Sequence, residues 1–160
     1  MRVTDKHVFF WKGNDIYSNF YYSPFKHQGK MFKWSEQAIM YRKAKLFGAN
    51  HIADKVLKAG SPVECKRLGR RRDLGFVESV WDEEKCRIFK EVLRDKFSLP
   101  QLKQQILQTG DKILVEASPY DNIWGIGMGE NDKGVDDPEN WKGQNLLGKV
   151  LGDIREELKR

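Results

Sequence analysis

Hydrophobic positions recur at helical spacing along most of the chain and predict a mostly helical protein. A capping box with proline at the first helical position, Ser61-Pro62-Val63-Glu64, marks one helix start, and glycines follow several helix ends. Ser35 is the expected N-cap of another helix. The expected helices cover residues 35–47, 50–59, 61–68, 81–97, 100–110 and 144–158.

Short apolar runs predict a small amount of β-structure. Residues 7–11 and 113–115 are strand candidates, and 23–27 pairs with 31–34 as a hairpin. Residues 118–143 have no apolar period and form a long loop of a kind that is often functional. With no repeat and no linker, the sequence predicts one α+β domain over residues 1–160, mostly helical with a small β-sheet.

Composition narrows the class of protein. The longest apolar run, residues 8–11, is far shorter than the about 20 residues of a membrane helix, so we expect a cytoplasmic protein without a membrane partner. Cys65 and Cys86 lie outside any CxxC motif, and the three histidines are isolated. We therefore expect two buried core thiols, no metal site and no cofactor.

Charge is distributed unevenly around a net of +6. Residues 1–72 hold 16 basic and 5 acidic side chains, whereas residues 73–160 hold 13 and 18. A positive amino-terminal half favours an anionic ligand such as phosphate, a nucleotide or nucleic acid. An ordinary solvated basic surface explains the charge equally well.

Glu36, Met40 and Lys43 are the first candidate site, because their spacing places them on one helical face. Two turns separate Glu36 from Lys43, roughly 10 Å along the axis, which admits a small ligand between an acid and an amine. Taken by itself, this spacing is more typical of a solvent-exposed charged stripe.

The segment Asp121-Asn122-Ile123-Trp124-Gly125-Ile126-Gly127 is the second candidate. It sets a carboxylate and an indole beside glycines that allow close backbone approach, and it lacks the pattern of a dinucleotide-binding motif. The alternative is a turn in which the Asp121 side chain accepts backbone N–H groups.

Arginines and aromatic residues supply the remaining candidates. The run Arg70-Arg71-Arg72 suits phosphate, since guanidinium binds it through a planar fork, but it also suits plain solvation. Phe20 (after Asn19), Trp34, Trp81 and Trp124 can stack on a heterocycle, although such rings more often lie in a core.

Together these blocks resemble the NADAR family, which includes the YbiA-like N-glycosidases. The similarity covers about residues 8–158, and it is the order and spacing of the blocks that make it specific. The matching blocks are Tyr17-Ser18-Asn19-Phe20, Ser23-Pro24-Phe25, Glu36-Gln37, Met40, Lys43-Ala44, Phe47-Gly48, Leu68-Gly69-Arg70, Trp81, Lys96-Phe97, residues 114–121 and 123–127, Trp141-Lys142-Gly143, residues 145–148 and Ile154-Arg155.

The resemblance implies hydrolysis of a ribose C1′–N bond without a metal. Two substrate sets are implied: phosphoribosylamino-pyrimidine intermediates of riboflavin synthesis, and ADP-ribose on the amino group of guanine, free or on DNA or RNA. Glu36, Lys43 and Asp121 become the expected catalytic residues, with Lys43 able to form a Schiff base. The expected substrate-binding residues are Asn19, Phe20, Arg70, Trp81, Trp124, Gly125, Ile126, Gly127 and Asn145.

The sequence departs from the family pattern at one point, and one alternative function remains open. The triple arginine is richer than the family's single Gly-Arg and fits a longer, nucleic-acid-like substrate. The alternative is a module that binds ADP-ribose or nucleic acid without turnover. Carboxylates paired with tryptophans favour the enzyme, because a phosphate binder gains nothing from them. We expect a monomer.

Overall fold

The computed structural model describes all residues, 1–160, in two compact units. The first unit contains residues 1–18 and 100–160, and the second contains residues 19–99. Helices outnumber strands in the element order, so the predicted α+β, mostly helical class is confirmed. A single domain over residues 1–160 stays a prediction. None of the helices is long and apolar enough to cross a membrane.

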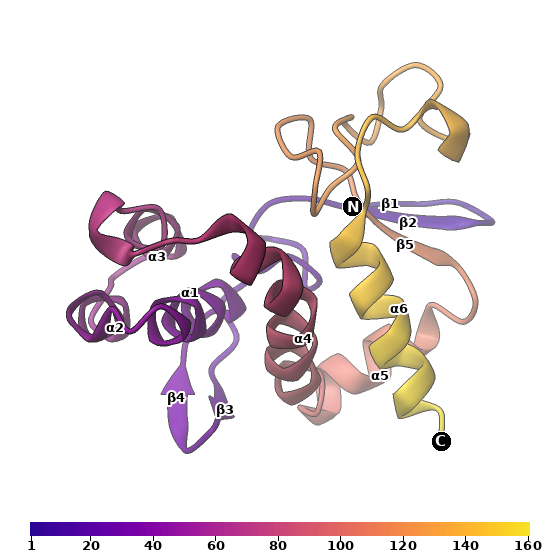
Figure 1. Ribbon diagram of the computed structural model, residues 1–160. Coiled ribbons are helices and arrows are strands. Elements are labelled where there is room, and N and C mark those ends of the chain that lie inside the picture. Colours follow the sequence, from indigo (N-terminus) through magenta and orange to yellow (C-terminus); the bar gives the residue numbers. More distant parts are fainter. The chain divides into compact units, whose positions relative to one another are not determined.

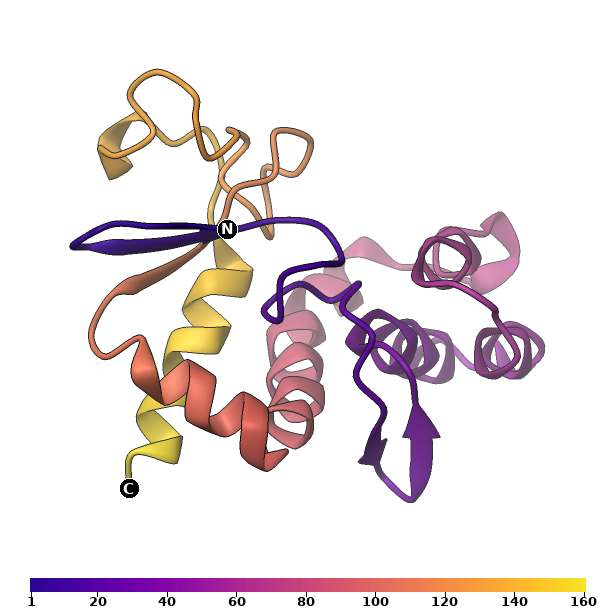
Figure 2. The same cartoon turned by 180° about the vertical axis from the view of Figure 1, so that it is seen from behind.

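The first unit is built on a three-stranded sheet, ordered β1 (Arg2–Val3), β2 (His7–Phe10) and β5 (Ile113–Glu116). β2 pairs antiparallel with β1 and parallel with β5, so that His7 lies beside Ile113. The helices α5 (Pro100–Gln108) and α6 (Leu146–Leu158) lie to one side of the sheet, and the loop after β5 lies to the other (Figures 1 and 2).

The long loop over residues 118–143 has a core of its own. Buried apolar side chains from the sheet and the loop pack together, and the half-buried Trp141 completes the cluster. The Trp141 indole donates to the backbone carbonyl of Val135 (2.7 Å), just before the short 3-10 helix η2 (Pro138–Asn140). The members of this cluster are Phe9, Val115, Ala117, Ile126, Met128 and Val135.

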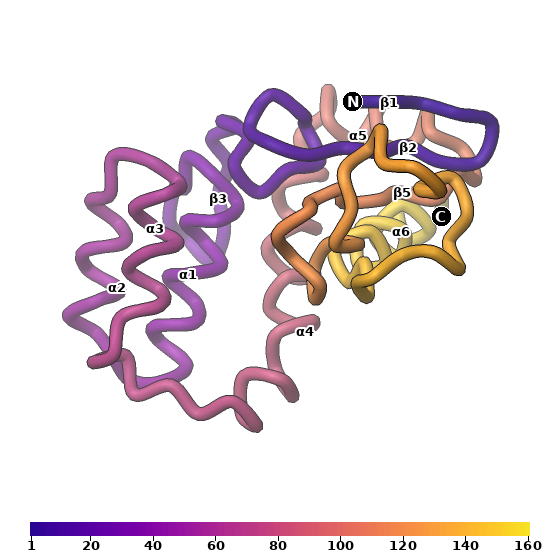
Figure 3. The backbone as a smooth tube through the Cα atoms, turned by 90° about the horizontal axis from the view of Figure 1, so that it is seen from above, coloured from indigo at the N-terminus to yellow at the C-terminus, as the bar shows by residue number.

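The second unit contains the predicted hairpin and four helices. β3 (Phe25–His27) and β4 (Lys30–Phe32) meet through Gln28 and Gly29, both at positive φ. α1 (Ser35–Leu46), α2 (Asn50–Leu57) and α3 (Pro62–Leu68) lie side by side (Figure 3). The 3-10 helix η1 (Arg72–Leu74) then leads to α4 (Glu78–Lys96).

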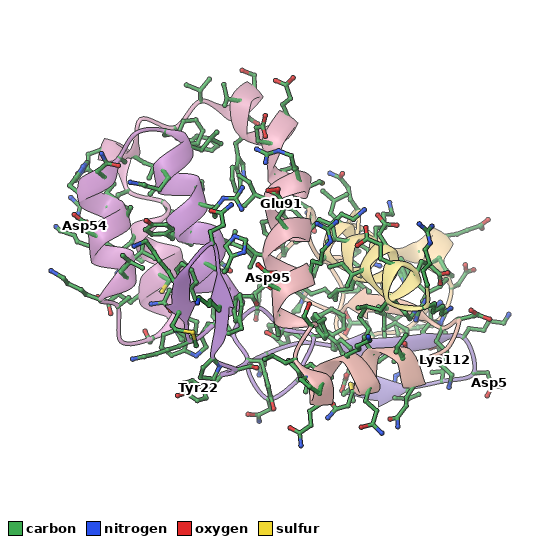
Figure 4. The ribbon with its side chains drawn as sticks, turned by 90° about the horizontal axis from the view of Figure 1, so that it is seen from below. Asp5, Tyr22, Asp54, Glu91, Asp95 and Lys112 are labelled. Carbon is green, nitrogen blue, oxygen red and sulfur yellow. The ribbon has the colours of Figure 1, made fainter.

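A polar network holds α1, the hairpin and α4 together. His27 is buried, and its Nδ1 lies 2.6 Å from a carboxylate oxygen of Asp95. Arg42 donates to His27 Nε2 (3.0 Å) and to Glu91 (2.8 Å). Since guanidinium can only donate, Nε2 is the acceptor and Nδ1 carries the proton. Glu91 and Asp95 are labelled on α4 in Figure 4.

Three expectations need correction. Ser35 is the first residue of α1 rather than its cap, because the Asn19 backbone carbonyl accepts the Glu36 N–H there. The long helix begins at Glu78, three residues early, since these exposed residues add nothing to the apolar period. Cys65 is buried as expected, but Cys86 is exposed because it falls on the outer face of α4.

Candidate active site

Glu36 lies in the first turn of α1 and is buried, with 8% of its surface exposed. Its backbone N–H donates to the Asn19 carbonyl (3.0 Å), while the Ser35 hydroxyl donates to the Asn19 side chain (2.8 Å). The amino end of a helix carries partial positive charge, which favours a carboxylate. Asn19, a predicted binding residue, therefore fixes the start of the helix that carries Glu36.

Lys43 lies two turns further along α1, between two aromatic rings. Its ammonium nitrogen is 4.9 Å from the centre of the Phe76 ring and 5.1 Å from that of Trp81. Trp81 is buried in the first turn of α4, whereas Phe76 is 46% exposed in the segment before that helix. We call Lys43, Phe76 and Trp81 the lysine cage.

The environment of the lysine cage makes the amine easier to deprotonate. Burial is the main cause that lowers the pKa of Lys43 below its ordinary value; the Glu36 carboxylate opposes this effect, and Arg70 adds to it. The charges of Glu36 and Arg70 therefore both act on Lys43 within this unit. With Trp81, the structure thus brings together four predicted site residues.

α3 closes the region behind Glu36. The Cys65 thiol is buried, and burial, followed by the charges of Glu36 and Glu64, raises its pKa to about 12. At Gly69, an added Cβ would lie 2.1 Å from Met40 Sδ, so a larger residue would require Met40 to move. Arg70 follows and is exposed, as the predicted contact with phosphate requires.

Phe20 lies beside a second cation of the same unit. The Lys66 ammonium is 5.8 Å from the centre of its ring, and Phe20 itself is partly exposed. Of the other arginines in the triple run, Arg71 forms a bidentate ion pair with Asp73 (2.9 and 2.7 Å). Arg70 and Arg72 are exposed, and no ion pair with an acidic side chain engages either of them.

The remaining predicted residues belong to the first unit, where Asp121 shapes a turn. One of its carboxylate oxygens accepts the N–H groups of Ile123 (2.9 Å) and Trp124 (2.8 Å). This is the structural role that the sequence left open as an alternative, and a catalytic role for Asp121 stays a prediction. Trp124 is partly exposed.

The segment after Asp121 holds the amino end of α6. Backbone carbonyls of residues 122–125 accept the N–H groups of residues 144–147, so the two segments lie directly against each other. An added Cβ at Gly125 would lie 2.9 Å from the Glu116 carbonyl, and Gly127 has φ +68°. Ile126 is fully buried in the loop core. The glycines and Ile126 thus have packing roles, and substrate contacts there stay predictions.

Asn145 is also engaged by the scaffold. It adopts a left-handed conformation (φ 52°), its amide donates to the Leu114 carbonyl (3.0 Å), and its side-chain oxygen accepts the Glu116 N–H (3.0 Å). Both polar atoms of the side chain therefore bond the backbone of β5. Its predicted contact with substrate stays a prediction.

Phe76 is the site residue that sequence reasoning missed. It lies outside every helical period, between η1 and α4, so no hydrophobic pattern marks it. The available signal was Gly75 directly before it, whose φ of +80° turns the chain at that point. One unit thus holds a partly desolvated amine between two rings and a buried carboxylate whose charge acts on that amine. This set is suited to general acid–base or nucleophilic chemistry on a flat, polar ligand.

Comparison with known proteins shows which family this chain resembles. The model of the NADAR domain matches residues 9–159. The N-glycosidase R617 of Acanthamoeba polyphaga mimivirus is 42% identical, over 96% of this chain and 97% of that protein. The chloroplastic riboflavin biosynthesis protein PYRR of Zea mays is 32% identical, over 94% of this chain but 25% of that protein.

A solved structure also matches this chain over nearly its whole length. The NMR structure of the E. coli protein YbiA superimposes with a TM-score of 0.78 and 28% identity, covering 99% of this chain and 88% of that one. The order of motifs, the fold and these matches, which extend over nearly the whole chain, agree with one another. The chain belongs to the NADAR domain family.

Proposed function

We propose that this hydrolase of N-glycosyl compounds cleaves the bond between ribose C1′ and a nitrogen of a planar heterocycle, in a substrate that carries phosphate. The observation that carries the proposal is the buried Glu36 carboxylate on the same helix as Lys43, close enough for its charge to act on the amine of the lysine cage. The N-glycosidase name of the mimiviral relative, which matches along the full length, supports the same class of reaction.

Glu36 suits the charge that develops during this reaction. As the C1′–N bond breaks, positive charge builds on the ribose ring, and a nearby buried carboxylate stabilises it. The water that replaces the base gives its oxygen to C1′ and a proton to the departing nitrogen. To Glu36, held at the start of α1, we assign the uptake and transfer of that proton.

Lys43 offers a second, covalent route. Its amine attacks C1′ of the opened sugar, the heterocycle leaves with a proton on nitrogen, and water then hydrolyses the resulting Schiff base. The lowered pKa of Lys43 favours this route, because only the free amine is nucleophilic. In the first route Lys43 instead remains an ammonium that holds the sugar or its phosphate.

The substrate carries two further groups that the second unit suits. Trp81 and Phe76 present aromatic surface for the heterocycle, and the exposed Arg70 is available for phosphate. Residues 19–99 contain 18 Lys and Arg against 10 Asp and Glu, which favours an anionic ligand, including ADP-ribose on guanine in a nucleic acid. The PYRR relative supports the riboflavin intermediate as a second candidate.

The test offers both substrates to the purified protein. ADP-ribosylated guanine in a DNA oligonucleotide and the phosphoribosylamino-pyrimidine are incubated separately, and released base and sugar are measured by mass spectrometry. We expect release of ADP-ribose from guanine with the nucleic acid left intact. Release from the pyrimidine alone would assign the riboflavin substrate, and release from neither, in folded protein, would overturn the proposal.

A further inference from the structure

Phe76 is a large apolar side chain that remains 46% exposed, yet its contacts are specific. Gly75, with φ +80°, turns the chain so that the Phe76 ring lies 5.5 Å from that of Phe47, the C-cap residue directly after α1. From there its face meets the Lys43 ammonium at 4.9 Å. A scattered surface phenylalanine needs no explanation, but this one covers the candidate nucleophile.

We propose that Phe76 is a positioning residue for Lys43: it forms the solvent-side wall of the lysine cage and controls the balance between ammonium and free amine. The inference rests on the role of Lys43 in the proposed function. It adds a residue that neither the family motifs nor the sequence pattern identifies.

The ring acts on Lys43 in two opposite ways. Its bulk excludes water from the amine, which favours the neutral form. Its π face attracts a cation, which favours the ammonium, and Trp81 does the same from the other side. The charged neighbours also oppose each other, because Glu36 favours the ammonium and Arg70 the free amine. Phe76 therefore sets the pKa of Lys43 both through its bulk and through the electrostatics of its ring. Substitutions at position 76 can separate these two effects.

Substituting leucine or alanine for Phe76 is expected to shift the pKa of Lys43 in opposite directions. Phe76→Leu keeps most of the bulk but removes the π face, so the pKa of Lys43 should fall by about half a pH unit. Phe76→Ala also admits water, and since burial is the main cause of the lowered pKa, it should bring the pKa back up towards its ordinary value. Phe76→Tyr keeps the ring and should match the wild type.

The titration of Lys43 can be followed directly. Lysines are converted to isotope-labelled dimethyl-lysines, and their NMR signals are followed across the alkaline range, with the Lys43 signal assigned by its loss in Lys43→Arg. Val77→Ala, an exposed neighbour on the same segment, is the matched control and should leave the Lys43 titration unchanged. Circular dichroism confirms that each variant is folded.

Opposite shifts for leucine and alanine support the proposal. Unchanged titration in both variants, or shifts of the same sign, would overturn it and return Phe76 to an ordinary surface position. The measurement requires no turnover, so it stands apart from the proposed function. If Lys43 is the nucleophile, the acidic limb of the kcat/KM profile should also move to lower pH in Phe76→Leu.

Discussion

At the scale of single residues, the contribution of the buried Glu36 charge to turnover can be measured by removing that charge. Glu36→Gln keeps the size and hydrogen bonding but removes the charge that stabilises the ribosyl cation. Turnover should fall by about 10²-fold or more, without a change in thermal stability, in a steady-state assay. The exposed Glu83, replaced in the same way, is the matched control. Near-normal turnover in folded Glu36→Gln would remove Glu36 from the chemistry.

Lys43 can be assigned to one of its two routes by chemical trapping. On the covalent route, borohydride reduces the Schiff base to a stable enzyme–ribose adduct, seen as a mass increase that is absent in Lys43→Ala. Lys43→Arg should then be inactive, because guanidinium stays protonated. Substantial turnover in Lys43→Arg with no adduct in the wild type would favour direct attack by water.

The two cysteines should react very differently. Burial raises the pKa of Cys65 to about 12, so that its thiol is inert in the folded protein, whereas Cys86 is exposed. Titration with a chromogenic disulfide should find one reactive thiol per native chain and two after denaturation. Cys86→Ser should leave none in the native state. A fast reaction at Cys65 would show that the packing behind Glu36 opens readily.

At the scale of elements, His27 joins the helix of Lys43 to the helix of Trp81. His27→Ala removes the acceptor of one Arg42 N–H, although Arg42 keeps its bond to Glu91, and it removes the histidine partner of Asp95. The free energy of unfolding should therefore fall by about 2–3 kcal/mol in urea titrations. His27→Asn, which keeps a donor near the Nδ1 position, should recover part of this loss. Lys26→Ala, exposed on the same strand, is the control. A loss within about 0.5 kcal/mol would show that the network is not needed.

The helices were predictable because each buries one face, and that face repeats along the sequence. The start of α4 could not be predicted in this way, because residues 78–80 are exposed and do not belong to a buried face. The parallel pairing of β2 with β5 was also beyond the pattern, because an apolar run indicates a buried strand but does not name a partner more than a hundred residues away. Equally, the spacing of Glu36 and Lys43 predicted a shared face but not the ring of Phe76, which comes from an aperiodic segment.

At the scale of the whole molecule, opposite net charges distinguish the two units. The second carries +8, and the first, with 11 basic and 13 acidic side chains, carries −2. If the substrate is attached to nucleic acid, KM should rise steeply with salt, in proportion to about one power of the salt concentration for each phosphate contact. For the small pyrimidine substrate the rise should be shallow. Measuring the salt dependence of KM for both substrates therefore shows whether the protein binds nucleic acid or only the small pyrimidine.

Arg70→Gln should reduce that salt dependence by about one phosphate contact. Lys149→Gln, which removes the same charge from an exposed position on α6, is the matched control and should leave the slope unchanged. Equal slopes for the two substrates would argue against a nucleic-acid substrate. Loss of slope in both variants would show that only total charge matters.

The bonding of Asn145 to β5 also occupies part of an outer edge of the sheet. β5 is an outer strand of the sheet, and free N–H and C=O groups on such a strand invite another chain to add to it. Here the Leu114 carbonyl and the Glu116 N–H are already bonded to one side chain, and Gly148 brings α6 so close that a Cβ would lie 2.0 Å from that carbonyl. A single residue at the start of α6 thus takes up two of the backbone groups with which another chain could pair along this edge of the sheet.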